Sequence, residues 1–219
     1  MNEMGNSGLA AGVRRALPTL QFITHGDVVA SAKAALEAGV KWVQFRCKQA
    51  ESTQDLLEKA WAVRCLCHEY GAMMSVNDYV YLVDECKAEA LHLGKEDMSI
   101  AEARRVVGPD ILIGGTAHNM EEIRAVAAAG ADYIGLGPFR YTATKEKLAP
   151  LLGVEGYRDL LAQCRAEGIN LPIYGIGGIL PDDADALRDT GLYGLAVSGA
   201  LLQAADAAEA RAAVRRLTF

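Results

Sequence analysis

Short apolar runs alternate along this chain with longer stretches in which apolar residues recur at helical spacing. The short runs predict buried strands at residues 19–24, 42–46, 73–76, 90–93, 111–114, 133–136, 172–174 and 195–197. The longer stretches predict helices at residues 28–37, 53–70, 79–86, 100–107, 120–129, 156–167, 182–189 and 201–217. Glycines just beyond several of these stretches, at positions 39, 71, 108, 130, 168 and 191, are typical of the left-handed residue that ends a helix. Each predicted strand is therefore followed by a helix.

Eight strand–helix pairs without a break in composition predict an α/β fold, a single (β/α)8 TIM barrel. We expect one domain over residues 1–219, of which residues 1–17 form an N-terminal extension. The competing fold is a doubly wound sheet, which typically has about five or six strands and a glycine-rich first turn. The residues after the first predicted strand, Thr24-His25-Gly26-Asp27, are not such a turn. The pattern therefore favours the barrel.

Composition and charge narrow the classes of partner. The formal net charge is -6 and the excess carboxylates are spread along the chain, which argues against nucleic acid or an anionic membrane as a partner. No apolar stretch reaches the roughly 18 to 20 residues of a membrane-spanning helix, and the first residues do not resemble a secretory signal. The 5 cysteines contain no double CxxC motif and are expected to be reduced and mostly buried. We therefore expect a cytoplasmic protein, and the sequence is compatible with a homo-oligomer.

The end of the second predicted strand carries an amide and two cations. Strand alternation places Gln44, Arg46 and Lys48 on one side, and Phe45 and Cys47 on the other. In a TIM barrel the active site lies at the carboxyl ends of the strands, so the first three side chains would face the barrel mouth. Two cations at that position predict an anionic ligand; the alternative is a solvated basic strand end.

Carboxylates follow the next two strands. Asn77 and Asp78 come after the third strand, and Asp97 follows the fourth. Carboxylates beside a cluster of cations predict a Mg²⁺ site, because Mg²⁺ binds through one or two carboxylates together with substrate phosphate oxygens and water. The alternative is that Asp78 and Asp97 cap the helices that follow them.

The residues after the fifth strand include a hydroxyl and an imidazole. Thr116 lies at the predicted rim. His118 is a candidate general base, and the alternative is a structural hydrogen bond. His25 and His92 also lie at strand ends. No Ser-His-Asp or Cys-His set is convincing along the chain.

Two later regions predict phosphate binding. The irregular segment 137–150 is long enough to be a lid, in which two hydroxyls and Lys145 would donate hydrogen bonds to a phosphate. Gly178 and Ser198 follow the seventh and eighth strands, where barrels commonly bind a phosphate through backbone N–H groups. Together with the cation and metal site, this pattern predicts a reaction between two small phosphorylated substrates.

Several motifs follow one another in barrel order: Gln44-Phe45-Arg46-Cys47-Lys48, Asn77-Asp78, His92-Leu93-Gly94-Lys95-Glu96-Asp97, Gly135-Leu136-Gly137-Pro138, Thr142-Ala143-Thr144-Lys145, Ile176-Gly177-Gly178-Ile179 and Val197-Ser198. With these motifs the chain resembles the thiamine-phosphate synthase family from residue 21 to residue 200. Enzymes of that family join a hydroxymethylpyrimidine pyrophosphate to a hydroxyethylthiazole phosphate, and they release thiamine phosphate and pyrophosphate. The resemblance therefore implies an Mg²⁺-dependent transferase.

The resemblance also implies a role for each motif. The pyrimidine pyrophosphate would be bound by Gln44, Phe45, Arg46, Cys47, Lys48, Asn77, Thr116 and Lys145, of which Arg46, Lys48 and Lys145 would act in catalysis. Asp78 and Asp97 would bind Mg²⁺. The thiazole phosphate would be held by Thr142, Ala143, Thr144, Gly178, Val197 and Ser198. Where the family often has Gln before its Glu-Asp pair, this chain has Lys95, which adds a charge near the metal site.

Three other functions are open at this point. A related protein resembling thiazole tautomerase would share the fold and the phosphate site, but the presence of the cations, both aspartates and Lys145 argues against it. A non-catalytic protein that binds a phosphorylated metabolite would need no pair of metal ligands. An unrelated phosphate-binding barrel of sugar or indole metabolism would require a Lys or carboxylate base deep in the barrel, and the first, seventh and eighth strands offer none.

Overall fold

The computed structural model describes residues 17–141 and 150–219, and these residues form a closed barrel whose parallel strands follow the order β1 to β8. The strands are β1 (Leu20–Ile23), β2 (Trp42–Phe45), β3 (Met73–Asn77), β4 (Ala90–Leu93), β5 (Leu112–Ala117), β6 (Tyr133–Leu136), β7 (Ile173–Ile176) and β8 (Gly194–Val197). The helices are α1 (Val28–Glu37), α2 (Thr53–Glu69), α3 (Val80–Glu85), α4 (Ile100–Val107), α5 (Met120–Ala128), α6 (Gly153–Ala166), α7 (Ala184–Arg188), α8 (Gly199–Leu202) and α9 (Ala207–Leu217), with a 3₁₀ turn η1 (Pro181–Asp183) before α7. The predicted (β/α)8 barrel is confirmed.

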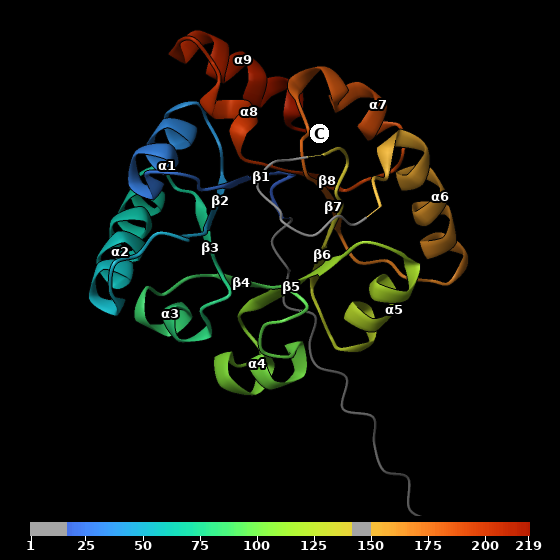
Figure 1. Ribbon diagram of the computed structural model, residues 1–219, viewed down its shortest axis with the longest axis horizontal. Helices are drawn as coiled ribbons and strands as arrows, with labels where there is room; N and C mark the ends of the chain where they lie inside the picture. The colour runs from blue at the N-terminus through green and yellow to red at the C-terminus, as the bar shows by residue number, and fades with distance from the viewer. Residues whose placement is uncertain (1–16, 142–149) are drawn as a thin grey trace, which may run out of the picture.

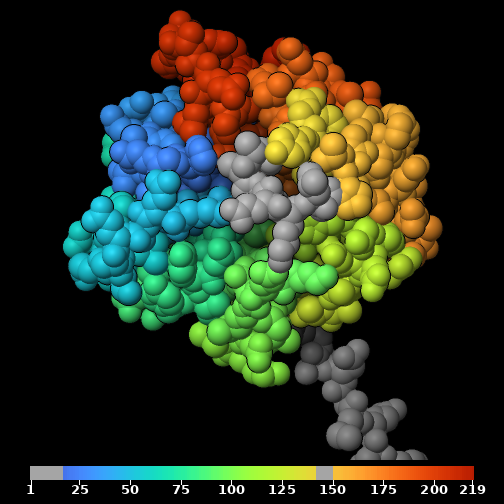
Figure 2. Space-filling view, in the orientation of Figure 1, coloured from blue at the N-terminus to red at the C-terminus, as the bar shows by residue number. Residues whose placement is uncertain are grey.

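The helices surround the barrel (Figure 1). Because each helix returns the chain to the start of the next parallel strand, successive units lie next to one another around the ring. The last unit closes on the first, since α8 contacts α1 and β8 pairs with β1. In the space-filling view the C-terminal segment accordingly lies beside α1 (Figure 2). Closure pairs both edges of each strand from β1 to β8, and the carboxyl ends of these strands meet at one mouth.

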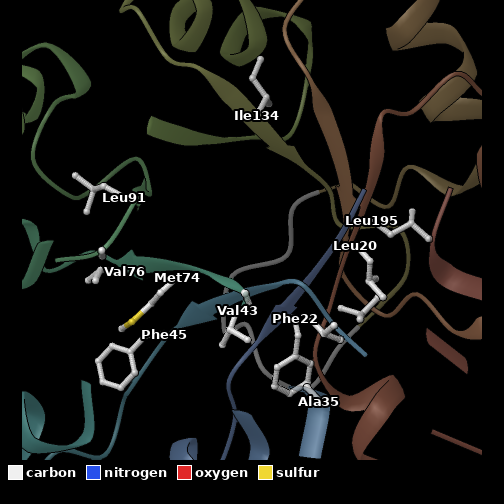
Figure 3. Packing of buried hydrophobic residues seen from close by; sticks show 14 of the residues in the cluster. Leu20, Phe22, Ala35, Val43, Phe45, Met74, Val76, Leu91, Ile134 and Leu195 are labelled. Carbon is white, nitrogen blue, oxygen red and sulfur yellow. The ribbon is translucent and has the colours of Figure 1, made fainter. Parts of the chain in front are cut away.

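Alternation along each strand produces two apolar layers. The outward-facing Phe22, Val43 and Phe45 are fully buried between the barrel and its helices, and Figure 3 shows Phe22 beside Ala35 of α1. Removing a side chain of this size from water contributes about 1.5–3 kcal/mol. This layer joins the helices to the barrel and fixes the direction in which the alternate, inward-facing residues point.

The inward-facing side chains fill the barrel below its mouth. Trp42 packs edge-on against Tyr133 and Tyr174, with ring centroids 5.0 and 5.3 Å apart. Its indole Nε1 donates a hydrogen bond to Ser75 Oγ at 3.0 Å. A Cβ at Gly114 would lie 2.1 Å from the Tyr133 ring, so only glycine fits at that position of β5. The aromatic cluster is the floor above which ligands can bind.

The glycines expected to end helices do so. Positions 39, 71, 108, 130, 168 and 191 all have positive φ, with values of 107, 59, 81, 87, 71 and 92°. The left-handed conformation at these positions is one that glycine adopts without a steric penalty. These helix ends were therefore correctly located from the sequence.

Several predicted elements differ from the structure in their bounds, and the helix predicted at 156–167 begins earlier, at Gly153. The helix predicted at 201–217 is two helices, because Asp206 caps a new helix by accepting hydrogen bonds from the N–H groups of Ala208 and Glu209. The helix predicted at 182–189 begins as the 3₁₀ turn η1 and continues as α7. The fifth strand continues beyond residue 114 to Ala117. There a glycine pair lies within the strand, because bulky neighbours such as Val126 fill the space of a Cβ at Gly115.

The structure agrees with the prediction that the cysteines are reduced and mostly buried. Within the described ranges, the cysteines form no disulfide, and Cys65 is the exposed one while Cys47, Cys67, Cys86 and Cys164 are buried. None of the helices in residues 17–141 and 150–219 is long and apolar enough to cross a membrane.

Candidate active site

A cavity of about 350 Å³ lies at the mouth of the barrel. Its lining includes the last residues of several strands, among them Ile23, Asn77, Ile176 and Val197. The remaining lining residues are His25, Gln44, Arg46, His92, Thr116, Gly137, Pro138, Gly177, Gly178, Ile179, Leu180, Ala196, Ser198, Gly199, Ala200 and Gln203. The cavity is thus where TIM barrels hold their active sites.

The end of β2 contributes the predicted amide and cation. Gln44 and Arg46 line the cavity, and Lys48 is exposed two residues further on. Thr24 fixes the backbone of Arg46, because its Oγ1 accepts a hydrogen bond from Arg46 N at 2.8 Å and donates one to Arg46 O at 3.0 Å. Gln44 is further held by a bond from its Nε2 to Gln21 Oε1 at 3.3 Å. The guanidinium therefore extends from a strand end that is anchored to β1.

Phe45 and Cys47 lie on the opposite side of β2, as the alternation predicts. Their exposed fractions are 0% and 5%, and both belong to the apolar layer between barrel and helices. Neither side chain lines the cavity formed by the described residues. A contact between substrate and either position would therefore come from main-chain atoms, and not from the phenyl ring or the thiol.

The fold brings Asp78 and Asp97 together, although 18 residues lie between them in the chain. Asp78 N donates a hydrogen bond to His92 O at 3.0 Å, which holds the end of β3 against β4. Asp97 Oδ2 accepts a hydrogen bond from Gly94 N at 2.6 Å. Loss of water around the Asp78 carboxyl, together with its hydrogen bond to Asp97 and the like charge of that residue, raises the pKa of Asp78 to about 6. Arg46 and Lys48 act in the opposite direction.

The alternative role of these aspartates as helix caps is wrong. Tyr79 occupies the cap position of α3, and Ser99 caps α4 by accepting a hydrogen bond from Glu102 N. Asp78 itself has a positive φ of 66°, a strained conformation for a residue other than glycine. In the described part of the chain no group of three or more His, Cys, Asp or Glu side chains could hold a metal. Among the described residues, the two carboxylates therefore form an acidic pair and not a larger cluster.

Thr116 belongs to a polar chain that the sequence did not predict. Its Oγ1 lies 3.0 Å from Nε2 of His92, whose Nδ1 lies 3.3 Å from the hydroxyl of Tyr133. A Cβ at Gly135 would lie 3.1 Å from His92 Cε1, so a glycine there leaves room for the imidazole. Thr116 and the buried His92 both line the cavity, and Tyr133 joins them to the barrel floor.

His118 makes the structural hydrogen bond that was its alternative. Its Nδ1 lies 2.8 Å from Glu122 Oε2, and the same carboxylate oxygen accepts a hydrogen bond from His118 N at 2.9 Å. His118 is not among the described residues that line the cavity. The candidate general base is thus engaged with α5 at the rim.

On the other side of the mouth the lining is mostly main chain. Ile176 O and Gly177 O accept hydrogen bonds from Phe139 N and Arg140 N at 2.9 and 3.0 Å. In an extended strand successive carbonyls point to opposite sides, whereas here two in a row meet one neighbouring segment. The change is possible because Gly177 and Gly178 have φ values of 98° and 73°. Consecutive amides in such a conformation form an anion-binding concavity.

The end of β8 completes this side. Val197 is the last residue of the strand, and Ser198 precedes α8, so both lie beside the glycine segment as expected. Pro138, Leu180 and Gln203 also line the cavity and were not predicted. Pro138 is the last residue of one quoted motif and Leu180 directly follows another, which was the available signal, whereas Gln203 had none.

Four residues of the predicted site lie outside the described residues. They are Thr142, Ala143, Thr144 and Lys145. Their predicted contacts with phosphate groups stay predictions.

Comparisons with known proteins identify the family. Residues 19–201 match the profile of the family described as thiamine monophosphate synthase. The chain is 45% identical over 195 residues to a thiamine-phosphate synthase of Bacteroides fragilis, covering 87% of this chain and 95% of that protein. It is 44% identical over 188 residues to the thiamine-phosphate synthase of Flavobacterium psychrophilum, covering 84% and 91%.

A solved structure agrees with the sequence matches. The thiamine phosphate pyrophosphorylase of Pyrococcus furiosus superposes with a TM-score of 0.79 at 33% identity, and the match covers 91% of this chain and 94% of that one. The 3-hexulose-6-phosphate synthase structure, at 17% identity and a TM-score of 0.59, shares the fold alone. Because the profile match and the relatives both extend over most of the barrel, the chain belongs to the thiamine monophosphate synthase family.

Proposed function

We propose that this chain condenses 4-amino-2-methyl-5-hydroxymethylpyrimidine pyrophosphate with 4-methyl-5-hydroxyethylthiazole phosphate, giving thiamine phosphate and pyrophosphate. One observation carries the proposal: the cavity is lined by the Arg46 guanidinium and the polar side chains of Gln44, Asn77 and Thr116 on one side, and by the glycine-rich main chain of residues 177–178 on the other. Two phosphorylated substrates can therefore be held face to face. The curated relatives named thiamine-phosphate synthase support the same reaction.

The pyrimidine pyrophosphate occupies the side formed by β2 to β5. Arg46 and Lys48 supply positive charge to the pyrophosphate, and Gln44, Asn77 and Thr116 supply hydrogen bonds to the substrate. Lys145 has the same predicted role as the two cations. The anchoring of Arg46 by Thr24 matters here, because a cation that is already in place costs no reorganisation during the reaction.

The chemistry requires charge stabilisation more than a base. The bond between the pyrimidine methylene carbon and the pyrophosphate oxygen breaks first, and the electron pair leaves with pyrophosphate. The aminopyrimidine ring stabilises the positive charge on the carbon, so no protein nucleophile is needed. Arg46 and Lys48 stabilise the charge that grows on the leaving group. The engagement of His118 with Glu122 fits a reaction without a general base at that position.

Mg²⁺ fits the pair of carboxylates. Burial raises the pKa of the Asp78 carboxyl, and the hydrogen bond and like charge of Asp97 raise it further. A cation between the two acids would relieve their repulsion. Asp78 and Asp97 would hold the ion, since Mg²⁺ sites in proteins commonly use one or two carboxylates together with substrate phosphate oxygens and water. When bound, the ion would neutralise part of the pyrophosphate charge.

The thiazole phosphate occupies the amide side. Gly178, Val197 and Ser198 would hold it, together with the predicted contacts of Thr142, Ala143 and Thr144. With its phosphate fixed there, the thiazole nitrogen faces the pyrimidine carbon and attacks it, forming the new carbon–nitrogen bond. The contribution of this side is orientation.

Free cysteines and a biosynthetic family support a cytoplasmic location.

The test is product formation by the purified chain. The protein is incubated with both precursors and Mg²⁺, with single-precursor mixtures and excess chelator as controls, and thiamine phosphate and pyrophosphate are measured separately. Equal amounts of the two products that require both precursors support the proposal. Rearrangement of the thiazole without condensation would instead identify a tautomerase, and binding of a precursor without any turnover would identify a non-catalytic protein.

A further inference from the structure

We propose that Arg140 is a positioning residue for phosphate binding, which holds the amide cradle after β7 in its anion-binding conformation from outside the cavity. The inference rests on the proposed function only for the identity of the substrate. The hydrogen bonds of Arg140 are independent of that function. Arg140 lies four residues beyond β6, whereas the segment that it holds, residues 177–180, follows β7. The described lining of the cavity includes residues 177–180 and does not include Arg140.

Three consecutive carbonyls of the cradle point to the segment that carries Arg140. Besides the main-chain bonds from Phe139 N to Ile176 O and from Arg140 N to Gly177 O, Arg140 Nη1 donates a hydrogen bond to Gly178 O at 3.0 Å. The first two carbonyls accept hydrogen bonds from backbone N–H groups, and these bonds do not depend on which side chain is at position 140. The third is held by the guanidinium.

The orientation of the third carbonyl decides where the next amide points. In a trans peptide the C=O and the following N–H point in opposite directions. Gly178 O faces Arg140, outside the cavity, so the N–H of Ile179 is directed to the cavity side. The same reasoning applies to the N–H groups of Gly177 and Gly178. Three amides thus converge from one side, and the third depends on a side chain.

Asp183 fixes both the guanidinium and the end of the cradle. Its Oδ1 accepts a hydrogen bond from Arg140 Nη2 at 2.6 Å, and its Oδ2 accepts one from Leu180 N at 2.8 Å. The Leu180 amide is therefore engaged with Asp183, and the guanidinium cannot rotate away from Gly178 O without breaking the ion pair. Arg140 also lies over the ring of Phe139, with 4.7 Å between Cζ and the ring centroid.

The two segments are packed too closely to move independently. A Cβ at Gly137 would lie 2.2 Å from Ile176 O, and one at Gly177 would lie 2.7 Å from Pro138 Cβ. Because these contacts hold the residues up to Gly177 in place, the peptide between Gly178 and Ile179 is the one that could still rotate. The hydrogen bond from Arg140 to Gly178 O restricts that rotation. Since glycine has the widest choice of backbone conformations, this peptide has the most to gain from an external hydrogen bond.

The test measures phosphate binding without relying on catalysis. Inorganic phosphate is titrated into the ¹⁵N-labelled full-length chain, and the midpoint is read from the amide resonances of Gly178 and Ile179. Arg140→Ala is expected to raise the midpoint about tenfold, the effect of one lost positioning hydrogen bond. An unchanged midpoint in Arg140→Ala would overturn the inference.

Two further variants separate positioning from simple attraction of an anion by a cation. Arg140→Lys keeps the charge but cannot donate to Gly178 O and Asp183 in a fork, so its midpoint should resemble that of Arg140→Ala. Asp183→Asn removes a negative charge, and simple attraction predicts tighter phosphate binding, whereas loss of positioning predicts weaker binding. A wild-type midpoint in Arg140→Lys, or a lowered midpoint in Asp183→Asn, would show that charge alone acts.

A matched control is the Arg124–Glu167 pair, which joins α5 to the residue after α6 with distances of 2.7 and 2.6 Å. Arg124→Ala should leave the phosphate midpoint unchanged. In turnover assays Arg140→Ala should raise the KM for the thiazole phosphate about tenfold and leave kcat within about twofold, because positioning of a bound group away from the reacting atoms affects both ground and transition states. If the wild-type chain forms no thiamine phosphate, the proposed function fails, while the phosphate titration still decides the role of Arg140.

Discussion

The two sides of the barrel mouth present different chemical groups. On the side of β2 to β4 the groups are charged side chains at strand ends, such as Arg46, Asp78 and Asp97. On the side of β6 to β8 they are main-chain amides of a glycine segment. Side-chain charges can stabilise a charge that develops during the reaction, whereas an amide cradle holds a phosphate whose charge stays constant. The difference predicts that the charged side governs the chemical step and the amide side governs binding.

Removing one carboxylate should have the largest effect. Asp78→Asn or Asp97→Asn is expected to lower kcat/KM by at least ~10²-fold, because several kcal/mol of charge stabilisation depends on the site. Initial rates as a function of Mg²⁺ concentration measure the loss. The matched control is Asp84→Asn, an exposed carboxylate on α3 that pairs with Lys87. Full activity of the wild type in excess chelator would contradict the metal site.

Removing the Arg46 cation, which directly follows β2, should affect the chemical step and leave binding on the amide side unchanged. Arg46→Ala is expected to lower kcat by about thirtyfold, because its charge acts on the departing pyrophosphate, and to leave affinity for the thiazole phosphate within about threefold. Calorimetric titration of each substrate, combined with single-turnover rates, separates the two effects. A loss of thiazole phosphate affinity with an unchanged rate would reverse our assignment of the two sides.

Adding bulk to the amide cradle should have the converse effect. Gly178→Val places a branched side chain at a φ of 73°, so the KM for the thiazole phosphate should rise about tenfold, while affinity for the pyrimidine pyrophosphate stays within about twofold. Gly168→Val is the matched control, because Gly168 has a φ of 71° and no atom near its Cβ position. Both variants should lose stability, but only Gly178→Val should change KM.

The smallest expected effect concerns the stability of the metal-free chain. The folded state raises the pKa of Asp78 from 3.8 to about 6, so it binds a proton more tightly than the unfolded state does. Stability from this group therefore increases as the pH falls through about 6 and is lowest above it. Asp78→Asn should raise the Tm by about 2 °C at about pH 8 without Mg²⁺, and the difference should vanish below about pH 4. A lower Tm for Asp78→Asn at pH 8 would contradict the raised pKa.

Local patterns were sufficient for much of the site. Alternation along β2 correctly separated Gln44 and Arg46 from Phe45 and Cys47, because a strand allows only two directions for its side chains. The same pattern could not reveal the chain from Thr116 through His92 to Tyr133. Those residues come from β5, β4 and β6, and their distances depend on how three strands align.

The order of strands and helices, the glycine helix ends and the set of polar strand ends follow from the sequence, since each depends on neighbours a few positions away. Closure of the barrel decided which of those residues meet. It placed Asp78 against Asp97, so that burial and like charge raise a pKa, and it brought the Arg140 side chain to Gly178 O. The division of 201–217 into α8 and α9 depends instead on the Asp206 cap, a local feature that the helix prediction missed. The contacts of Asp78 with Asp97 and of Arg140 with Gly178 join residues that are distant in the chain, and they exist only once the strands are in register.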